Sequence, residues 1–242
     1  GAEHGNAIAR NSAWRQAVPD SQFVSLAEAA RLRALAWNAR GTGYASTVSP
    51  EAWELFALRL QDAERALLDA PPALMESPAW HIALLAIAMD SDRVRSHSLE
   101  VFSTAVKRWP TYAMFYQLPL NRMVPKWGGS WQQVESFIAK SAATQPASEG
   151  KALYARLYIH LIPERSAHES EMNWEMMKAG FEDAIARFPD PKYKNLYASY
   201  ACLAKDKALF NKAMAKIPRE ELITAWWLNG HSYDACMRWA GI

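Results

Sequence analysis

Apolar residues recur along the chain at spacings of three and four, and sustained alternation of apolar and polar residues is absent. The first spacing places apolar side chains on one face of an α-helix, whereas alternation would indicate strands. Helix-start signals recur too, because a residue with a capping oxygen precedes a proline at Ser49-Pro50, Ser77-Pro78 and Asp190-Pro191. Glycine is scarce, with 10 residues. The sequence therefore predicts an all-α protein.

A pattern of the form Phe-x2-Ala-x4-Pro recurs within this helical chain. It is complete at 102–110, 181–189 and 210–218, and weaker copies keep some of its residues. Its closing prolines are Pro71, Pro110, Pro146, Pro189 and Pro218. A second pattern, anchored by an aromatic residue, alternates with the first, and its anchors are Trp80, Tyr112, Tyr154, Tyr193 and Trp226. Because the prolines and the aromatic anchors alternate along the chain at similar intervals, they indicate a repeat of helical hairpins.

This combination resembles the tetratricopeptide repeat, in which an aromatic-anchored helix is followed by a helix that ends at a proline. The resemblance implies a tetratricopeptide-like α-hairpin superhelix, a degenerate right-handed α-α solenoid. We expect an N-terminal extension at 1–21 and a single helical-repeat domain at 22–242. Its approximate repeats are 22–71, 77–110, 111–146, 150–189 and 190–218, with a C-terminal capping helix at 220–242.

The segment 126–131 carries two tryptophans around Gly128-Gly129-Ser130. The repeat alignment places it between two helices, and Ser130 with Gln133 predicts a capping box at the start of the second helix. The two glycines can supply the positive φ of a tight turn. We interpret the segment as the turn of a helical hairpin. The alternative is a displayed aromatic loop that binds a partner, because exposed tryptophan is a frequent interface anchor.

Three short motifs follow one another in the chain, from Arg40 to Ala45, from Val48 to Trp53 and from Lys126 to Ser130. Together with the later stretch 197–207, they resemble an uncharacterised bacterial family catalogued as domain of unknown function 4034. The resemblance implies a bacterial source and a helical fold, and it supplies no known activity.

Charge is balanced, with 27 basic and 25 acidic residues and no long run of one sign. The chain therefore lacks the electrostatic footprint of a nucleic-acid binder, although a local patch is not excluded. The longest apolar stretch, which contains 83–89, is too short to span a bilayer. The sequence starts at Gly1 without Met, so a targeting segment could have been removed. We leave the compartment open between cytoplasm and periplasm.

Cys202 and Cys236 are the only cysteines, and neither their spacing nor that of the six histidines suits zinc. We expect no metal and no cofactor. Buried free thiols are the ordinary interpretation of such cysteines. The alternative is a disulfide, because the repeat alignment places the two residues at similar heights on neighbouring first helices. A disulfide would indicate an oxidising compartment.

Candidate catalytic groups are few. Asp90-Ser91-Asp92 resembles the D-x-D of metal-dependent sugar transferases, but we interpret it as a capped turn. His168 to Glu171 lies in a polar insertion typical of a solvated loop. His160 follows tyrosines on a helix and is interpreted as a hydrogen-bonded histidine. Because nucleophile-elbow, zinc-protease and dinucleotide motifs are also missing from the sequence, we expect a protein that is not an enzyme and assign no catalytic residue.

The tetratricopeptide resemblance also implies a concave groove lined by the first helix of each pair. Its exposed positions would be His81, Leu85, Ala88, Ala113, Gln117, Leu120, Ala155, Ile159, Ile162, Lys194, Ala198, Ala201, Trp227, His231 and Asp234. Only Lys194 has a fixed positive charge, so the basic carboxylate clamp of chaperone-binding members is absent. Such an apolar lining fits either tight winding without an open groove, which we expect, or a groove for an amphipathic helix.

Our leading hypothesis is a bacterial protein–protein interaction module that binds through its shape and its exposed aromatics. The candidate partner-binding residues are His81, Gln117, Ile159, Lys194, Trp227, His231 and Trp127. A second hypothesis is an immunity or inhibitor protein that blocks a toxin or effector. A third is a hydrolase or transferase that uses Asp90, Asp92 or His160.

Overall fold

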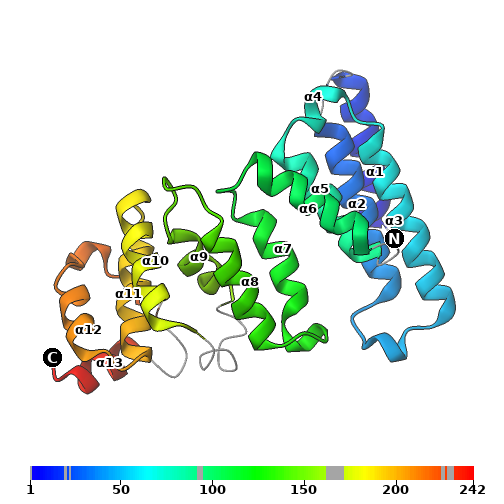
Figure 1. The fold of residues 1–242 in the computed structure, drawn as a ribbon. Coiled ribbons are helices and arrows are strands. Elements are labelled where there is room, and N and C mark those ends of the chain that lie inside the picture. The colour runs from blue at the N-terminus through cyan, green and yellow to red at the C-terminus, as the bar shows by residue number, and fades with distance from the viewer. Residues whose placement is uncertain are drawn as a thin grey trace. The chain divides into compact units, whose positions relative to one another are not determined.

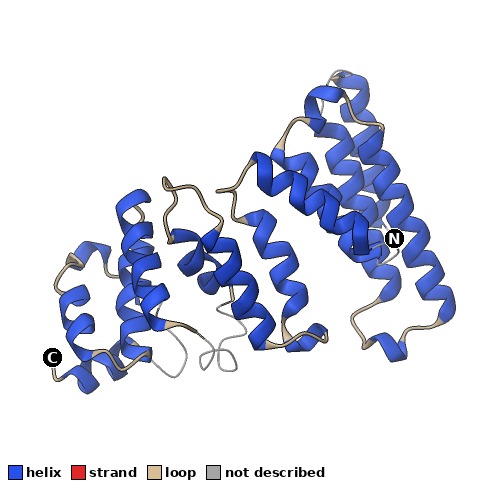
Figure 2. Cartoon of the chain, viewed as in Figure 1, coloured by secondary structure: helices blue, strands red, loops and turns tan. Residues whose placement is uncertain are grey.

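The structure is a computed structural model that describes residues 2–18, 21, 23–91, 95–161, 172–224, 227 and 232–242. Within these residues the regular structure is helical and contains no strand (Figure 1, Figure 2). The predicted all-α class is therefore confirmed for the described residues, and helices that follow one another in the chain pack together. The chain divides into two compact units, Gly1–Leu118 and Pro119–Ile242.

The first unit contains α1 to α6. Their bounds are α1 Ala2–Ala17, α2 Phe23–Arg40, α3 Pro50–Leu68, α4 Pro72–Met75, α5 Pro78–Ser91 and α6 Arg95–Arg108, with a 3-10 turn at Ala45–Thr47. Helix α7, Met114–Met123, begins in the first unit and ends in the second. The second unit continues with α8 Trp131–Ala143, α9 Ala152–His160, α10 Trp174–Arg187, α11 Pro191–Leu203, α12 Lys207–Met214 and α13 Tyr233–Ala240.

The proline-marked helix starts are confirmed, because α3, α5 and α11 each begin at the predicted proline. In each case the preceding side chain accepts a hydrogen bond from a backbone amide of the first turn, which would otherwise have no partner within the helix. The three bonds are Ala52 N to Ser49 Oγ, Trp80 N to Ser77 Oγ and Lys192 N to Asp190 Oδ1.

Repeat positions form the core of the hairpins in the second unit. Phe181, Ala184 and Phe210 are fully buried, as the repeat pattern predicts. Helices α9 and α10 approach closely at Gly180, where an added Cβ would lie 2.9 Å from the Lys151 carbonyl oxygen. A larger side chain at this position would separate the two helices, so the glycine allows the close approach.

Among the described anchoring aromatics, one does not occupy its expected place, and the fifth anchor, Trp226, lies outside the described residues. Trp80, Tyr154 and Tyr193 are buried, but Tyr112 is 43% exposed. The expectation is wrong for Tyr112 because α7 begins only at Met114, so this tyrosine lies in the preceding turn. Phe115 takes the buried position instead, and its ring stacks on Trp109 with 5.9 Å between centroids.

The segment between α7 and α8 forms a tight turn, as predicted. Ser130 and Gln133 make the reciprocal bonds of a capping box, and Gly128 adopts a left-handed φ of 86°. Gly129 does not use a positive φ, so this part of the prediction is wrong. Its role is a close approach, because an added Cβ would lie 1.9 Å from the Met123 carbonyl oxygen.

A disulfide joins Cys202 on α11 to Cys236 on α13, with 5.8 Å between the Cα atoms. The interpretation of these cysteines as free thiols is therefore wrong, and the alternative from the repeat alignment holds. Both cysteines belong to a buried cluster with Phe210 and Trp227. The bond links the last helix covalently to the hairpin formed by α11 and α12.

Candidate binding cleft

Two of the candidate partner-binding residues are part of the packing. His81 is 8% exposed, and its ring lies edge-on between the rings of Trp80 and Trp109. Trp227 is 7% exposed and packs against Phe210 and Tyr233. The expectation that these two side chains are exposed is wrong.

The physical reason differs between the two residues. His81 lies on α5, a helix that is apolar on most of its surface and is buried over most of its length. Trp227 does not lie on a continuous capping helix, because a 3-10 turn ends at Glu221 and α13 begins only at Tyr233. Its position therefore cannot be transferred from a helical register. His231 lies outside the described residues.

The remaining candidates have different surroundings. Trp127 is 45% exposed, and the charged groups of Arg122 and Lys126 lie 5.3 and 5.8 Å from its ring centroid. Gln117 is half-buried, and Ile159 packs against the cluster around Tyr193. Gln117 belongs to the first unit, whereas Trp127, Ile159 and Lys194 belong to the second.

The transferred groove positions are mostly buried. Those buried are His81, Leu85, Ala88, Ala113, Leu120, Ala155, Ala198, Ala201 and Trp227, and Ile162 lies outside the described residues. Their side chains contribute to packing within each unit. These buried positions therefore do not form a binding surface.

Asp90 is a buried packing residue rather than part of a capped turn. Its side chain is 1% exposed, and Oδ2 accepts hydrogen bonds of 2.7 Å from Arg33 Nε and from Trp37 Nε1. These bonds hold α5 to α2. The predicted helix end is present, because α5 ends at Ser91, but the Asp90 side chain binds α2 instead of capping a turn, so that part of the interpretation is wrong. Asp92 and the segment 168–171 lie outside the described residues.

His160 is hydrogen-bonded, as expected. One ring nitrogen, Nε2, lies 2.9 Å from the side-chain oxygen of Asn121. Burial lowers the pKa of His160, because a partly buried imidazole loses hydration in its charged form. The neutral imidazole is therefore the favoured form near pH 7.

A carboxylate that the sequence did not single out connects three helices of the second unit. Glu135 on α8 accepts hydrogen bonds from the hydroxyl groups of Tyr154 and Tyr158 on α9. The Tyr154 oxygen in turn accepts a bond of 3.0 Å from the Asn173 amide at the start of α10. Burial raises the pKa of both tyrosines. This network fixes the α9–α10 hairpin to α8.

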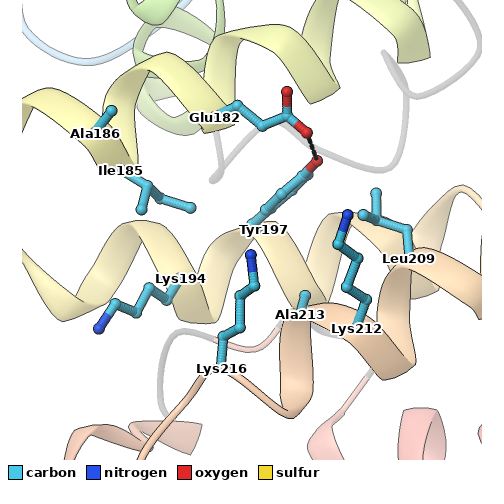
Figure 3. A pocket seen from close by; sticks show the side chains of 9 residues that line it. All are labelled: Glu182, Ile185, Ala186, Lys194, Tyr197, Leu209, Lys212, Ala213 and Lys216. Atoms are coloured by element: carbon cyan, nitrogen blue, oxygen red, sulfur yellow. Dashed lines mark hydrogen bonds between the residues drawn. The ribbon is translucent and has the colours of Figure 1, made fainter.

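An open cleft of about 230 Å³ lies between α10, α11 and α12 of the second unit (Figure 3). Apolar side chains form its walls, and polar groups surround them. The apolar residues are Ile185 and Ala186 from α10 and Leu209 and Ala213 from α12. The polar residues are Glu182, Lys194, Tyr197, Lys212 and Lys216.

The charged groups of the cleft are only partly paired. Lys194 Nζ lies 2.7 Å from Glu221 Oε2, and the Tyr197 hydroxyl donates a hydrogen bond of 3.3 Å to Glu182 Oε1. Burial, followed by the nearby Glu182 charge, raises the pKa of Tyr197. Lys212 and Lys216 have no ion-pair partner in the described part of the chain. The cleft therefore has two unpaired ammonium groups and one carboxylate besides the neutral Lys194–Glu221 pair.

The spacing of residues along α12 explains how its side chains reach the cleft. Leu209, Lys212 and Ala213 differ by three and four positions, which places them on one face of a helix, and Lys216 continues this face in the following turn. Asp206 fixes the start of α12, because its carboxylate accepts bonds from the Leu209 amide and from Trp174 Nε1 on α10. Figure 3 shows Lys212 and Lys216 reaching from this side toward α11.

One lysine of this cleft was predicted from the sequence as a binding residue, and two were not. Lys194 was selected because it lies on a first helix, where the groove was expected. Lys212 and Lys216 belong to a second helix and to the turn after it, so the groove rule passed over them. The signal that could have found them is the spacing of Leu209, Lys212 and Lys216 on one helical face.

No described helix combines the length and the apolar character needed to cross a bilayer. In the same part of the chain, no group of three or more His, Cys, Asp or Glu side chains could hold a metal ion. Comparison with known proteins adds no relative: no protein-family model, no curated protein and no solved structure matches the chain significantly.

Proposed function

We propose that this chain is a non-enzymatic protein-binding module built from tetratricopeptide-like α-hairpins. The repeated burial of Phe181, Ala184 and Phe210 supports this architecture, and so does the close approach of α9 and α10 at Gly180. Hairpins that pack in chain order form a stable scaffold on which surface residues are free to serve binding. The resemblance to domain of unknown function 4034 fits a bacterial source for such a module.

The α10–α12 cleft is the observation that carries the proposal. Its volume of about 230 Å³ lies below the range of about 300–1,000 Å³ that small-molecule sites usually have. A cleft of this size suits one or two side chains of a larger partner better than a whole small ligand. Apolar walls beside fixed charges are also the arrangement in which an interface anchor is desolvated and oriented.

The disulfide indicates in which cellular compartment the proposed module functions. Disulfides persist in oxidising compartments and are rare in the reducing cytosol. Of the two compartments left open by the sequence, the Cys202–Cys236 bond favours the periplasm over the cytoplasm. The proposed module therefore meets its partner outside the cytoplasm.

Site-specific photo-crosslinking tests the proposal. A benzophenone amino acid is placed at Ala186, an exposed cleft residue, and at Ala143, which is also exposed, lies at the end of α8 and serves as the control. Each protein is illuminated in native lysate, and adducts are resolved by mass. We expect a protein adduct from position 186 that excess unlabelled protein suppresses, and none from position 143. No adduct from 186, or equal adducts from both positions, would contradict a partner-binding role of the cleft.

A further inference from the structure

We infer that the α10–α12 cleft binds an acidic peptide segment, with a side-chain carboxylate between Lys212 and Lys216 and a neighbouring apolar side chain against Ile185 and Leu209. This inference rests on the proposed function and specifies the chemistry of the partner. The site differs from the groove expected from the repeat, because two of its three lysines come from α12 and the turn after it.

The lysines give the cleft a charge that favours an anionic ligand. The Lys194 ammonium group is already neutralised by Glu221, and Tyr197 donates its hydroxyl hydrogen to Glu182. The two remaining ammonium groups, on Lys212 and Lys216, exceed the single Glu182 carboxylate by one positive charge. A ligand with one carboxylate would balance the charges of the side chains that line the cleft, with Lys194 already paired to Glu221. Charge-assisted hydrogen bonds from both ammonium groups would hold it.

The apolar walls of the cleft favour a ligand that also carries an apolar group. Ile185, Ala186, Leu209 and Ala213 give the cleft an apolar surface next to the ammonium groups. An apolar side chain that leaves water for this surface gains free energy in proportion to the area it buries. An inorganic anion could not use this surface. The cleft therefore fits a ligand that combines a carboxylate with an apolar group.

Two other kinds of anion fit less well. A nucleic acid carries a phosphate at every nucleotide, and its backbone would approach the carboxylates of Glu182 and Glu221 as well as the lysines. A small carboxylic acid would find less volume than small-molecule sites usually provide. A peptide avoids both difficulties, because it inserts one or two side chains and leaves the rest of its chain outside.

Peptide binding measured by fluorescence anisotropy tests the inference. The probes are fluorescein-labelled heptapeptides, blocked at both ends, in which one glutamate lies between a leucine and a phenylalanine. Matched peptides carry glutamine in place of glutamate. We expect the acidic peptides to bind the full chain, with an affinity that falls as sodium chloride is added. The glutamine peptides should bind at least about tenfold more weakly, because they lose the charge-assisted hydrogen bonds to the ammonium groups.

Variants locate the binding in the cleft. Lys212→Gln and Lys216→Gln remove charge from exposed side chains, so the fold should persist, which circular dichroism checks. Each should raise the Kd of the acidic peptides by about tenfold. Lys140→Gln changes an exposed lysine on α8 and is the matched control, with an unchanged Kd. Equal Kd values for the cleft variants and the control would overturn the inference.

Further arms separate the alternatives. Stronger binding of peptides whose only carboxylate is the free C-terminus would overturn the assignment to a side-chain carboxylate. Equal or stronger binding of octanoate, or of a single-stranded oligonucleotide, would overturn the choice of a peptide. Crosslinking at Ala186 without any preference for acidic peptides would refute this inference and leave the proposed function standing. Neither crosslinking nor peptide binding would refute both.

Discussion

Reducing the Cys202–Cys236 disulfide should destabilise the second unit strongly. The two cysteines are separated by 34 positions, so the bond closes a loop that the reduced, unfolded chain would explore freely. The loop-closure relation for this length gives an entropy loss of about 13 cal/mol/K, or about 4 kcal/mol at 25 °C. We therefore expect the free energy of unfolding to fall by about 4 kcal/mol on reduction, as an upper estimate.

The loss of stability on reduction should be concentrated at the C-terminal end of the second unit. Helix α13 has only 8 residues, and an isolated helix of this length is marginal in water. Its attachment depends on the disulfide and on contacts such as that of Trp239 with Phe210, whose ring centroids lie 5.8 Å apart. After reduction, the amides of 233–240 should exchange with solvent faster than those of α10 and α11.

Urea denaturation with and without a phosphine reductant measures the effect, with circular dichroism as the readout. For a urea slope of about 2 kcal/mol/M, a loss of 4 kcal/mol lowers the midpoint by about 2 M. The Cys202→Ala/Cys236→Ala double variant is the control, because its midpoint should not respond to the reductant. Oxidised and reduced midpoints that agree within about 0.5 M, which corresponds to about 1 kcal/mol, would refute the reasoning.

Three further predictions concern single residues, and thermal or urea unfolding measures each. Gly129→Ala should lower the free energy of unfolding by about 1–3 kcal/mol, because its Cβ would lie 1.9 Å from the Met123 carbonyl oxygen. An unchanged free energy of unfolding would disprove the close approach. Asp206→Ala should cost about 1 kcal/mol through the lost cap of α12, and Asp206→Asn less. The hydrogen bond from the Leu209 amide holds the pKa of Asp206 below its usual range, so the ionised carboxylate stabilises the fold at neutral pH. The difference in free energy of unfolding between Asp206→Ala and the parent should therefore shrink as the pH falls through the pKa of Asp206 in the folded protein. Trp227→Ala should cost about 3–5 kcal/mol, because a buried indole is removed from the C-terminal cluster, and an unchanged stability would contradict its burial.

Helix starts were predictable because they depend on neighbours in the sequence. Ser49 before Pro50, and Ser130 three residues before Gln133, carry their hydrogen-bond partners within one turn. Such signals need no knowledge of the tertiary fold. The same holds for the buried repeat alanines such as Ala184, whose helical spacing from Phe181 is local as well.

The exposure of a side chain could be predicted only where the helix begins and continues at the positions that the repeat pattern predicts. Tyr112 lies just before α7 rather than inside it, so its side chain is exposed. Trp227 lies between a 3-10 turn and α13, and its ring turns into the cluster that the disulfide closes. A shift of two residues at a helix start is enough to move a side chain to another face, because successive helical residues are about 100° apart.

The cleft could not be predicted from the sequence, because the charge composition does not show which charged side chains form ion pairs. With 27 basic and 25 acidic residues, the chain has nearly no net charge to distribute. Individual lysines nevertheless differ in whether they form an ion pair. Lys194 forms one with Glu221, which lies 27 positions away in the sequence. Lys212 on the neighbouring helix has no ion-pair partner among the described residues. Only the fold decides which ammonium groups stay unpaired. A balanced composition therefore argues against a surface for a polyanion and still permits a cleft that selects a single carboxylate.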